Sequence, residues 1–113
     1  MNELNDNAKE NKIKARDLVL EAYEEEKKKN YDQALQALSE ALKLDNMQPS
    51  WHASQGRFLE KLDRFEEALK SYERAVKICD EPNPSYLRLL GLCAFRIGCD
   101  EQAYEALQLA VSS

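Results

Sequence analysis

The feature that most constrains the fold is a set of small residues repeated along the chain. Ala34 and Ala68 lie 34 residues apart, and Ala103 follows after another 35. Each of the three has a second Ala seven residues later and an Ala or Gly twelve residues earlier. The flanking members of the three sets are Ala41, Ala75, Ala110, Ala22, Gly56 and Gly91. Internal repetition with a period of 20 to 50 residues is typical of stacked supersecondary units.

The small residues indicate where helices approach each other closely, because only Ala or Gly leaves room for a neighbouring helix at the crossing point. Large side chains flank each predicted crossing at spacings of three and four, which places them on one face of a helix. They are Leu35, Leu38 and Leu42, then Leu69, Tyr72 and Val76, then Tyr104, Leu107 and Val111. We therefore expect an all-α chain of six helices in three antiparallel pairs. The predicted ranges are 12–29, 32–44, 50–61, 65–79, 84–97 and 100–111.

Local sequence signals support these boundaries. Asn30 and Asp63 each stand three residues before a Gln or a Glu, the arrangement of a capping box. Asn83 precedes Pro84, which predicts a helix cap followed by a proline in the first turn. Gly98 follows the fifth periodic segment and is expected to end that helix.

This pattern resembles the tetratricopeptide repeat family, whose unit contains a Leu-Gly pair, an aromatic residue and a pair of Ala residues. Leu90-Gly91 and Tyr72 match the Leu-Gly pair and the aromatic residue, while Leu18, His52 and Leu87 occupy the place of the family's Trp. The resemblance implies a right-handed superhelical solenoid with repeats at about 15–48, 49–83 and 84–113. We expect one domain over 12–113 and a polar, disordered segment over 1–11.

Composition narrows the function. A net charge of −5 without a basic stripe disfavours nucleic acid as a partner. There is no apolar run of about 20 residues and no signal peptide at the N-terminus, so we expect a cytoplasmic protein without membrane insertion. A lone histidine, three unpaired cysteines and no phosphate-loop or nucleophile motif predict no metal, no cofactor and no catalytic residue.

The resemblance also implies a concave groove lined by the first helix of each repeat. The groove residues implied are Arg16, Val19, Leu20, Tyr23, Ser50, Ala53, Ser54, Arg57, Lys61, Ser85, Arg88, Leu89, Leu92, Phe95 and Arg96. Their mixture of apolar side chains and arginines is typical of protein interfaces. The alternative is that Val19, Leu20 and Leu92 pack against neighbouring helices and meet no ligand.

For one known class of ligand, the residues that bind it can be compared directly with this sequence. Family members that serve the heat-shock machinery hold a C-terminal carboxylate with a clamp of Lys and Asn residues. At the matching places this chain has Val19, Tyr23, Ser54, Ser85 and Leu89. The resemblance therefore favours a partner segment held partly by apolar side chains, with an acidic element facing the arginines.

These observations favour an adaptor or scaffold that binds a segment of another protein. The alternative is a dedicated chaperone for one client, because residues 80–98 have a faint similarity to the last repeat of small chaperones of type III secretion. A further surface is expected on the last helix, where Tyr104, Leu107 and Val111 have only their own helix pair to pack on. We expect a partner or a second copy of the chain to cover it, or a further repeat if the chain is part of a longer array.

Overall fold

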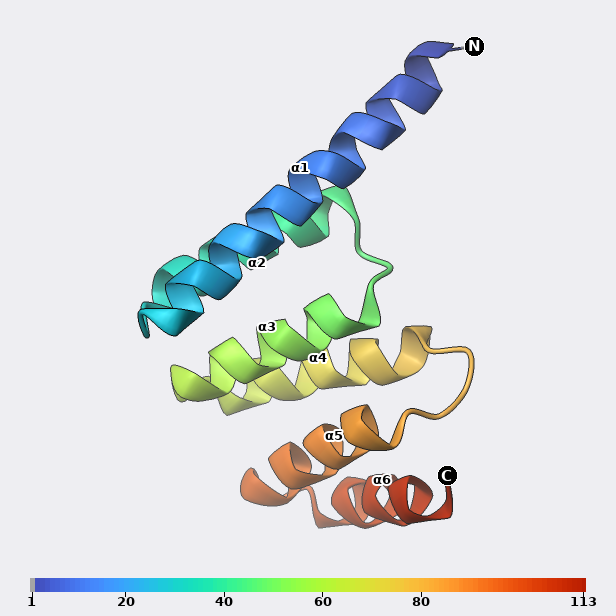
Figure 1. Ribbon diagram of the computed structural model, residues 1–113. Coiled ribbons are helices and arrows are strands. Elements are labelled where there is room, and N and C mark those ends of the chain that lie inside the picture. The colour runs from blue at the N-terminus through green and yellow to red at the C-terminus, as the bar shows by residue number, and fades with distance from the viewer. Residues whose placement is uncertain (1) are drawn as a thin grey trace. The chain divides into compact units, whose positions relative to one another are not determined.

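The computed structural model describes residues 2–113, with side chains from residue 7 onward. Within this range the chain forms six α-helices and no strand (Figure 1). The helices are α1 (Asn2–Lys27), α2 (Tyr31–Leu44), α3 (Pro49–Lys61), α4 (Phe65–Ile78), α5 (Pro84–Arg96) and α6 (Asp100–Ser112). The predicted all-α fold of three antiparallel helix pairs is confirmed.

The chain divides into two compact units. The first extends to Met47 and consists of α1 packed against α2. The second, Gln48–Ser113, contains the pairs α3/α4 and α5/α6, which are joined by contacts between α4 and α5. No helix in the described range is long and apolar enough to pass through a lipid bilayer.

The small residues lie where the helices of a pair meet, as predicted. A Cβ atom added at Gly56 would come within 2.7 Å of Cδ1 of Tyr72, on the other helix of the pair. A Cβ atom added at Gly91 would lie 2.7 Å from Cγ of Leu107. In the first unit Ala22 is fully buried. Since real Cβ atoms do not approach other heavy atoms this closely, a larger residue at either position would force the facing side chain, Tyr72 or Leu107, to move.

The two helices of each pair are joined by the same type of backbone turn. Lys29, Asp63 and Gly98 have φ angles of 65°, 59° and 86°, all in the left-handed region. After each of them, the next amide donates a hydrogen bond to a carbonyl five residues back, for example from Cys99 to Ala94 at 2.8 Å. This is the Schellman arrangement, which satisfies carbonyl groups at a helix end. Only Gly98 signalled this turn in the sequence, because Lys rarely adopts a left-handed conformation and Asp63 was assigned to a helix cap.

The capping-box prediction was wrong at both positions. Asn30 precedes α2, but its side chain makes no cap and instead donates to Oε1 of Glu25 at 3.2 Å. Asp63 occupies the left-handed position of a turn, and Arg64 is the residue that precedes α4. After each Schellman turn, the residue before the next helix has a ψ of about 70°, outside the extended conformation that a side-chain cap usually takes. The cap at Asn83 is confirmed, since its Oδ1 accepts from the amide of Tyr86 at 3.1 Å.

The N-terminal expectation also needs correction. Residues 2–11, which we expected to be disordered, belong to α1, while Met1 lies outside the described residues. There is no Gly or Pro before Pro49, so nothing in the local sequence stops a helix. The buried residues of α1 begin at Ala15, so the helix continues toward the N-terminus beyond the part that packs against the core.

Candidate functional site

The fifth helix has two faces of different character. One face is buried against neighbouring helices and consists of Leu87, Leu90, Gly91, Cys93 and Ala94. On the opposite side, 54% of Leu92 and 67% of Phe95 are exposed. Because the core face is already complete, these two side chains form surplus apolar area of the kind found at interfaces. This exposure of Leu92 contradicts the alternative prediction that it packs against neighbouring helices.

Basic side chains are present on the same helix and on α3. Arg88 and Arg96 are exposed on α5, while Lys61 is exposed and Arg57 half-buried on α3. The guanidinium carbon of Arg96 lies 5.0 Å from the centroid of the Phe65 ring, which is the geometry of a cation–π contact. We use the term binding face for the exposed residues of this part of the second unit, namely Arg57, Lys61, Arg88, Leu92, Phe95 and Arg96.

A hollow of about 240 Å³ lies at the C-terminal ends of α3 and α5. It is lined by Arg57, Glu60, Lys61, Asp63, Phe65 and Arg96. Glu60 also accepts a hydrogen bond from the hydroxyl of Tyr72, a side chain with no exposed surface. Burial raises the pKa of Tyr72 far above its ordinary value, and the carboxylate of Glu60 raises it further. The tyrosine is therefore a permanent hydrogen-bond donor to a residue that lines the hollow.

Cys93 lies behind this region in the interior. It has no exposed surface, and its thiol donates to the backbone carbonyl of Phe65 at 3.4 Å. Burial raises its pKa to about 11, with a further contribution from the charge of Glu60. Because the thiolate is the nucleophilic form of cysteine, Cys93 is unsuited to nucleophilic chemistry at neutral pH.

The predicted residues of the second unit do not all reach the surface. Ser54 and Ala53 are buried, and Leu89 is half-buried, whereas Ser50 and Ser85 are exposed. Ser54 lies beneath Arg57, whose Nη1 is 3.5 Å from the serine hydroxyl. Ser54 is therefore placed to position Arg57 and not to contact a partner itself.

In the first unit, the predicted residues are likewise divided. Val19 is buried, which agrees with the packing alternative, whereas Leu20 is 62% exposed and Arg16 is also exposed. Tyr23 is half-buried.

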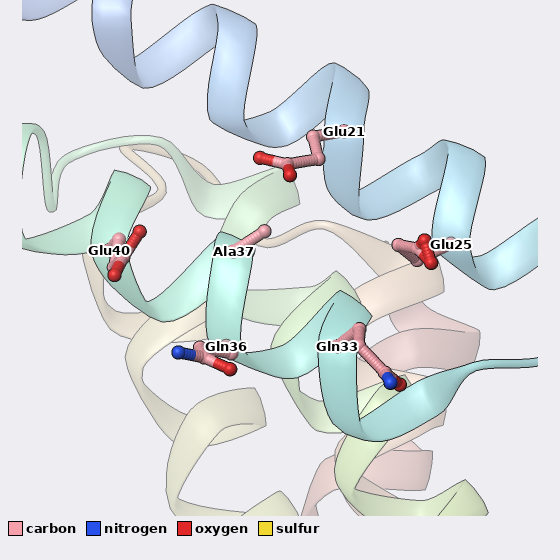
Figure 2. Close-up of a pocket in the computed structure, with 6 residues that line it drawn as sticks. All are labelled: Glu21, Glu25, Gln33, Gln36, Ala37 and Glu40. Carbon is pink, nitrogen blue, oxygen red and sulfur yellow. The ribbon is translucent and has the colours of Figure 1, made fainter.

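The structure also shows an acidic hollow in the first unit that the sequence analysis did not anticipate. Figure 2 shows the residues around it, with Glu21 and Glu25 on α1 and Ala37 facing them from α2. The hollow measures about 270 Å³ and is lined by Glu21, Glu25, Gln33, Gln36, Ala37 and Glu40. These residues come from two helices and recur at spacings of three and four. The hollow could therefore have been predicted by considering the facing sides of both helices together.

The predicted surface on the last helix is present as exposed area. A hollow of about 370 Å³ is lined by Tyr104, Leu107, Gln108, Val111 and Ser112. Tyr104 is 64% and Val111 87% exposed, while Leu107 is half-buried where it contacts the Gly91 region of α5. Association through this surface stays a prediction, which light scattering over a range of concentrations would test. A monomer at every concentration would contradict the self-association form of it.

Comparison with known proteins places the fold. The family model described as tetratricopeptide repeat matches residues 19–84. No curated protein matches the sequence.

Several solved structures share the architecture at low sequence identity. The second tetratricopeptide domain of Spaghetti (RPAP3), solved with the HSP90 peptide SRMEEVD, is 18% identical with a TM-score of 0.82; the match covers 92% of this chain and 95% of that one. The TPR2B domain of yeast Sti1 in its pHsp70 complex is 21% identical with a TM-score of 0.79, covering 87% and 78%. MamA is 16% identical with a TM-score of 0.81; the match covers 87% of this chain but only 57% of MamA.

Proposed function

Because the chain belongs to the tetratricopeptide repeat family, we propose that it is a non-catalytic module that binds a segment of a partner protein. The segment lies on the binding face of α3 and α5. The observation that carries this proposal is the exposure of Leu92 and Phe95 on a helix whose core face is already filled. Covering two such side chains releases apolar area from water, which favours association.

Charge indicates the chemistry of the segment. The chain as a whole carries a net charge of −5, yet the four cations of the binding face outnumber the two carboxylates, Glu60 and Asp63, of the hollow that three of them line. Such local reversal of charge favours an acidic segment and disfavours basic ones, because complementary potentials increase both specificity and association rate. We therefore propose a segment that combines bulky apolar residues with acidic ones.

The structural neighbours support binding of a segment over binding of a whole folded surface. The Spaghetti domain is bound to a short peptide, SRMEEVD, which contains acidic residues and a methionine. This chain lacks the Lys and Asn clamp residues at the matching places, and two of those places, Val19 and Ser54, are buried. We propose that it recognises its segment through the side chains of the binding face and not through that clamp.

The remaining aspects of the proposal concern chemistry and location. We propose that the protein is not an enzyme and does not bind nucleic acid, in agreement with its acidic charge and with the protonated state of the buried Cys93. We propose a cytoplasmic location, which agrees with three cysteines that remain free thiols.

The test is selection of binders from a random twelve-residue peptide library displayed on phage, followed by affinity measurement on the purified chain. Leu92→Glu or Arg88→Glu is expected to weaken binding of the selected peptides at least about ten-fold, because residues at the centre of an interface dominate its energy. Leu109→Glu provides the matched control, since Leu109 is a partly exposed leucine on α6 and lies outside the binding face. Circular dichroism is expected to show unchanged helicity in all three variants. Peptides that bind the Leu92→Glu variant as tightly as the wild type would refute the proposal.

A further inference from the structure

We infer that the hollow at the C-terminal ends of α3 and α5 receives an acidic side chain of the partner segment, and that Tyr72 keeps it available by restraining Glu60. This inference rests on the proposed function. It adds a specific subsite for one carboxylate next to the apolar area of Leu92 and Phe95, and it gives a buried core residue a role in specificity.

Two arginines of the hollow are held in place before any ligand arrives. Arg96 lies over the Phe65 ring at 5.0 Å, and a guanidinium that stacks by its face keeps the N–H groups at its edge for hydrogen bonding. Arg57 lies 5.3 Å from the centroid of the Phe58 ring and is 3.5 Å from the hydroxyl of Ser54. Because both head groups are already positioned, less side-chain entropy is lost when they bind a carboxylate.

Glu60 is the side chain that could defeat this arrangement. It lines the hollow together with Arg57, Lys61 and Arg96, so its own carboxylate is an internal competitor for a ligand carboxylate. The hydroxyl of Tyr72 donates a hydrogen bond to Glu60 from the core. Tyr72 has no exposed surface and cannot follow Glu60 if that side chain turns toward the arginines. The hydrogen bond therefore holds Glu60 on the inner side of the hollow.

The charge balance favours a single negative charge over a phosphate group. The lining contains three cationic residues and two carboxylates, Glu60 and Asp63. A net positive charge near one matches the carboxylate of Asp or Glu. A phosphate group carries nearly two negative charges at neutral pH and would meet stronger repulsion from the two carboxylates.

The first experiment measures how strongly a selected peptide depends on its acidic residues. Peptides selected from the random library are expected to contain an Asp or Glu near their apolar residues. Replacing that residue by Gln or Asn is expected to weaken binding to the wild-type chain by about five-fold, the upper range for one exposed ion pair. The same replacement is expected to have a smaller effect on binding to the Arg96→Gln variant, in which the hollow has lost one cation without gaining a carboxylate. Arg74→Gln is the matched control, because Arg74 is exposed on α4 and does not line the hollow.

The second experiment separates the role of Tyr72 in specificity from its role in packing. Tyr72→Phe keeps the ring and removes the hydrogen bond to Glu60, so it is expected to weaken binding of the acidic peptide by about five-fold and to leave binding of its amide variant unchanged. The double variant Tyr72→Phe with Glu60→Gln is expected to restore binding, because the internal competitor has lost its charge. Equal weakening of both peptides, or no restoration, would overturn the role assigned to Tyr72.

The outcomes also separate this inference from the proposed function. If the Gln or Asn replacement in the peptide changes nothing while Leu92→Glu still abolishes binding, the subsite is refuted and the proposed function stands. If a phosphoserine peptide binds more tightly than the Glu peptide, the assignment to a carboxylate is refuted. If no selected peptide is sensitive to Leu92→Glu, both proposals fall.

Discussion

The close contact between Gly56 and Tyr72 predicts that Gly56→Ala destabilises the protein, the opposite of its usual effect in a helix. In an exposed helix, Gly→Ala stabilises by about 0.8–1 kcal/mol, because Ala has the higher helix propensity. At Gly56 the added Cβ would lie 2.7 Å from Cδ1 and 2.8 Å from Cζ of Tyr72. The ring has no exposed surface and its hydroxyl is hydrogen-bonded to Glu60, so the ring cannot move away without disturbing the core. Overpacking of this kind costs about 1–3 kcal/mol.

Because the buried ring cannot move away, the upper part of this range, about 2–3 kcal/mol, applies. Subtracting the gain in helix propensity, we expect Gly56→Ala to destabilise the protein by about 1–2 kcal/mol. With a urea dependence of about 2 kcal/mol per molar, the middle of the usual range, the midpoint of unfolding falls by about 0.5–1 M. Urea titrations followed by circular dichroism at 222 nm measure this shift, and two-state behaviour is checked by a second probe such as the fluorescence of Trp51.

Two comparisons identify the ring of Tyr72 as the cause. Gly91→Ala is expected to cost less, because the added Cβ meets the side chain of Leu107, which is half-buried and can move. In a Tyr72→Leu background the cost of Gly56→Ala is expected to shrink, since the ring is gone, and a double-mutant cycle measures the coupling. If the Gly56→Ala protein is as stable as the wild type, or more stable, the claim is refuted that α3 and α4 pack too closely at Gly56 for a Cβ atom.

Three further predictions follow from the helix ends and the cysteines. Lys29→Gly is expected to stabilise the protein by about 0.5–1 kcal/mol in thermal unfolding, because Lys29 has a positive φ, whereas Lys28→Gly is expected not to stabilise it. Asn83→Ala is expected to lose about 1 kcal/mol by the same measurement, since its side chain caps α5, and an unchanged midpoint would contradict the cap. Thiol reagents are expected to modify the exposed Cys99 and to spare Cys93 in the native protein. A mass spectrum showing rapid modification of Cys93 in the native protein would contradict its burial. Since the pKa of Cys93 is raised from 9.0 to about 11 in the folded state, its contribution to the free energy of unfolding is complete below pH 9 and is lost as the pH rises toward 11.

The candidate site was only partly accessible to prediction. The exposure of Leu92 and Phe95 followed from the sequence, because other residues of α5 already supply the face that packs on the core. The hollow did not follow, since Glu60 and Phe65 were not among the predicted groove residues. Their participation depends on a contact between different helices, the stacking of Arg96 on Phe65, which spans 31 positions of sequence and leaves no periodic signal.

The sequence by itself determined the helices, their pairing and the positions where they touch. These properties depend on local periodicity and on the absence of a side chain at the crossing points, and both can be read directly from the order of residues. Only the tertiary structure decided that Lys29 and Asp63 take left-handed conformations, that Ser54 is buried beneath Arg57, and that Tyr72 holds Glu60. The hydrogen bond from Tyr72 to Glu60 joins α4 to α3, and the burial of Ser54 depends on the helices packed around it, so local periodicity predicts neither. The left-handed turns are closed by local backbone hydrogen bonds, but neither Lys nor Asp marks such a turn as clearly as glycine does.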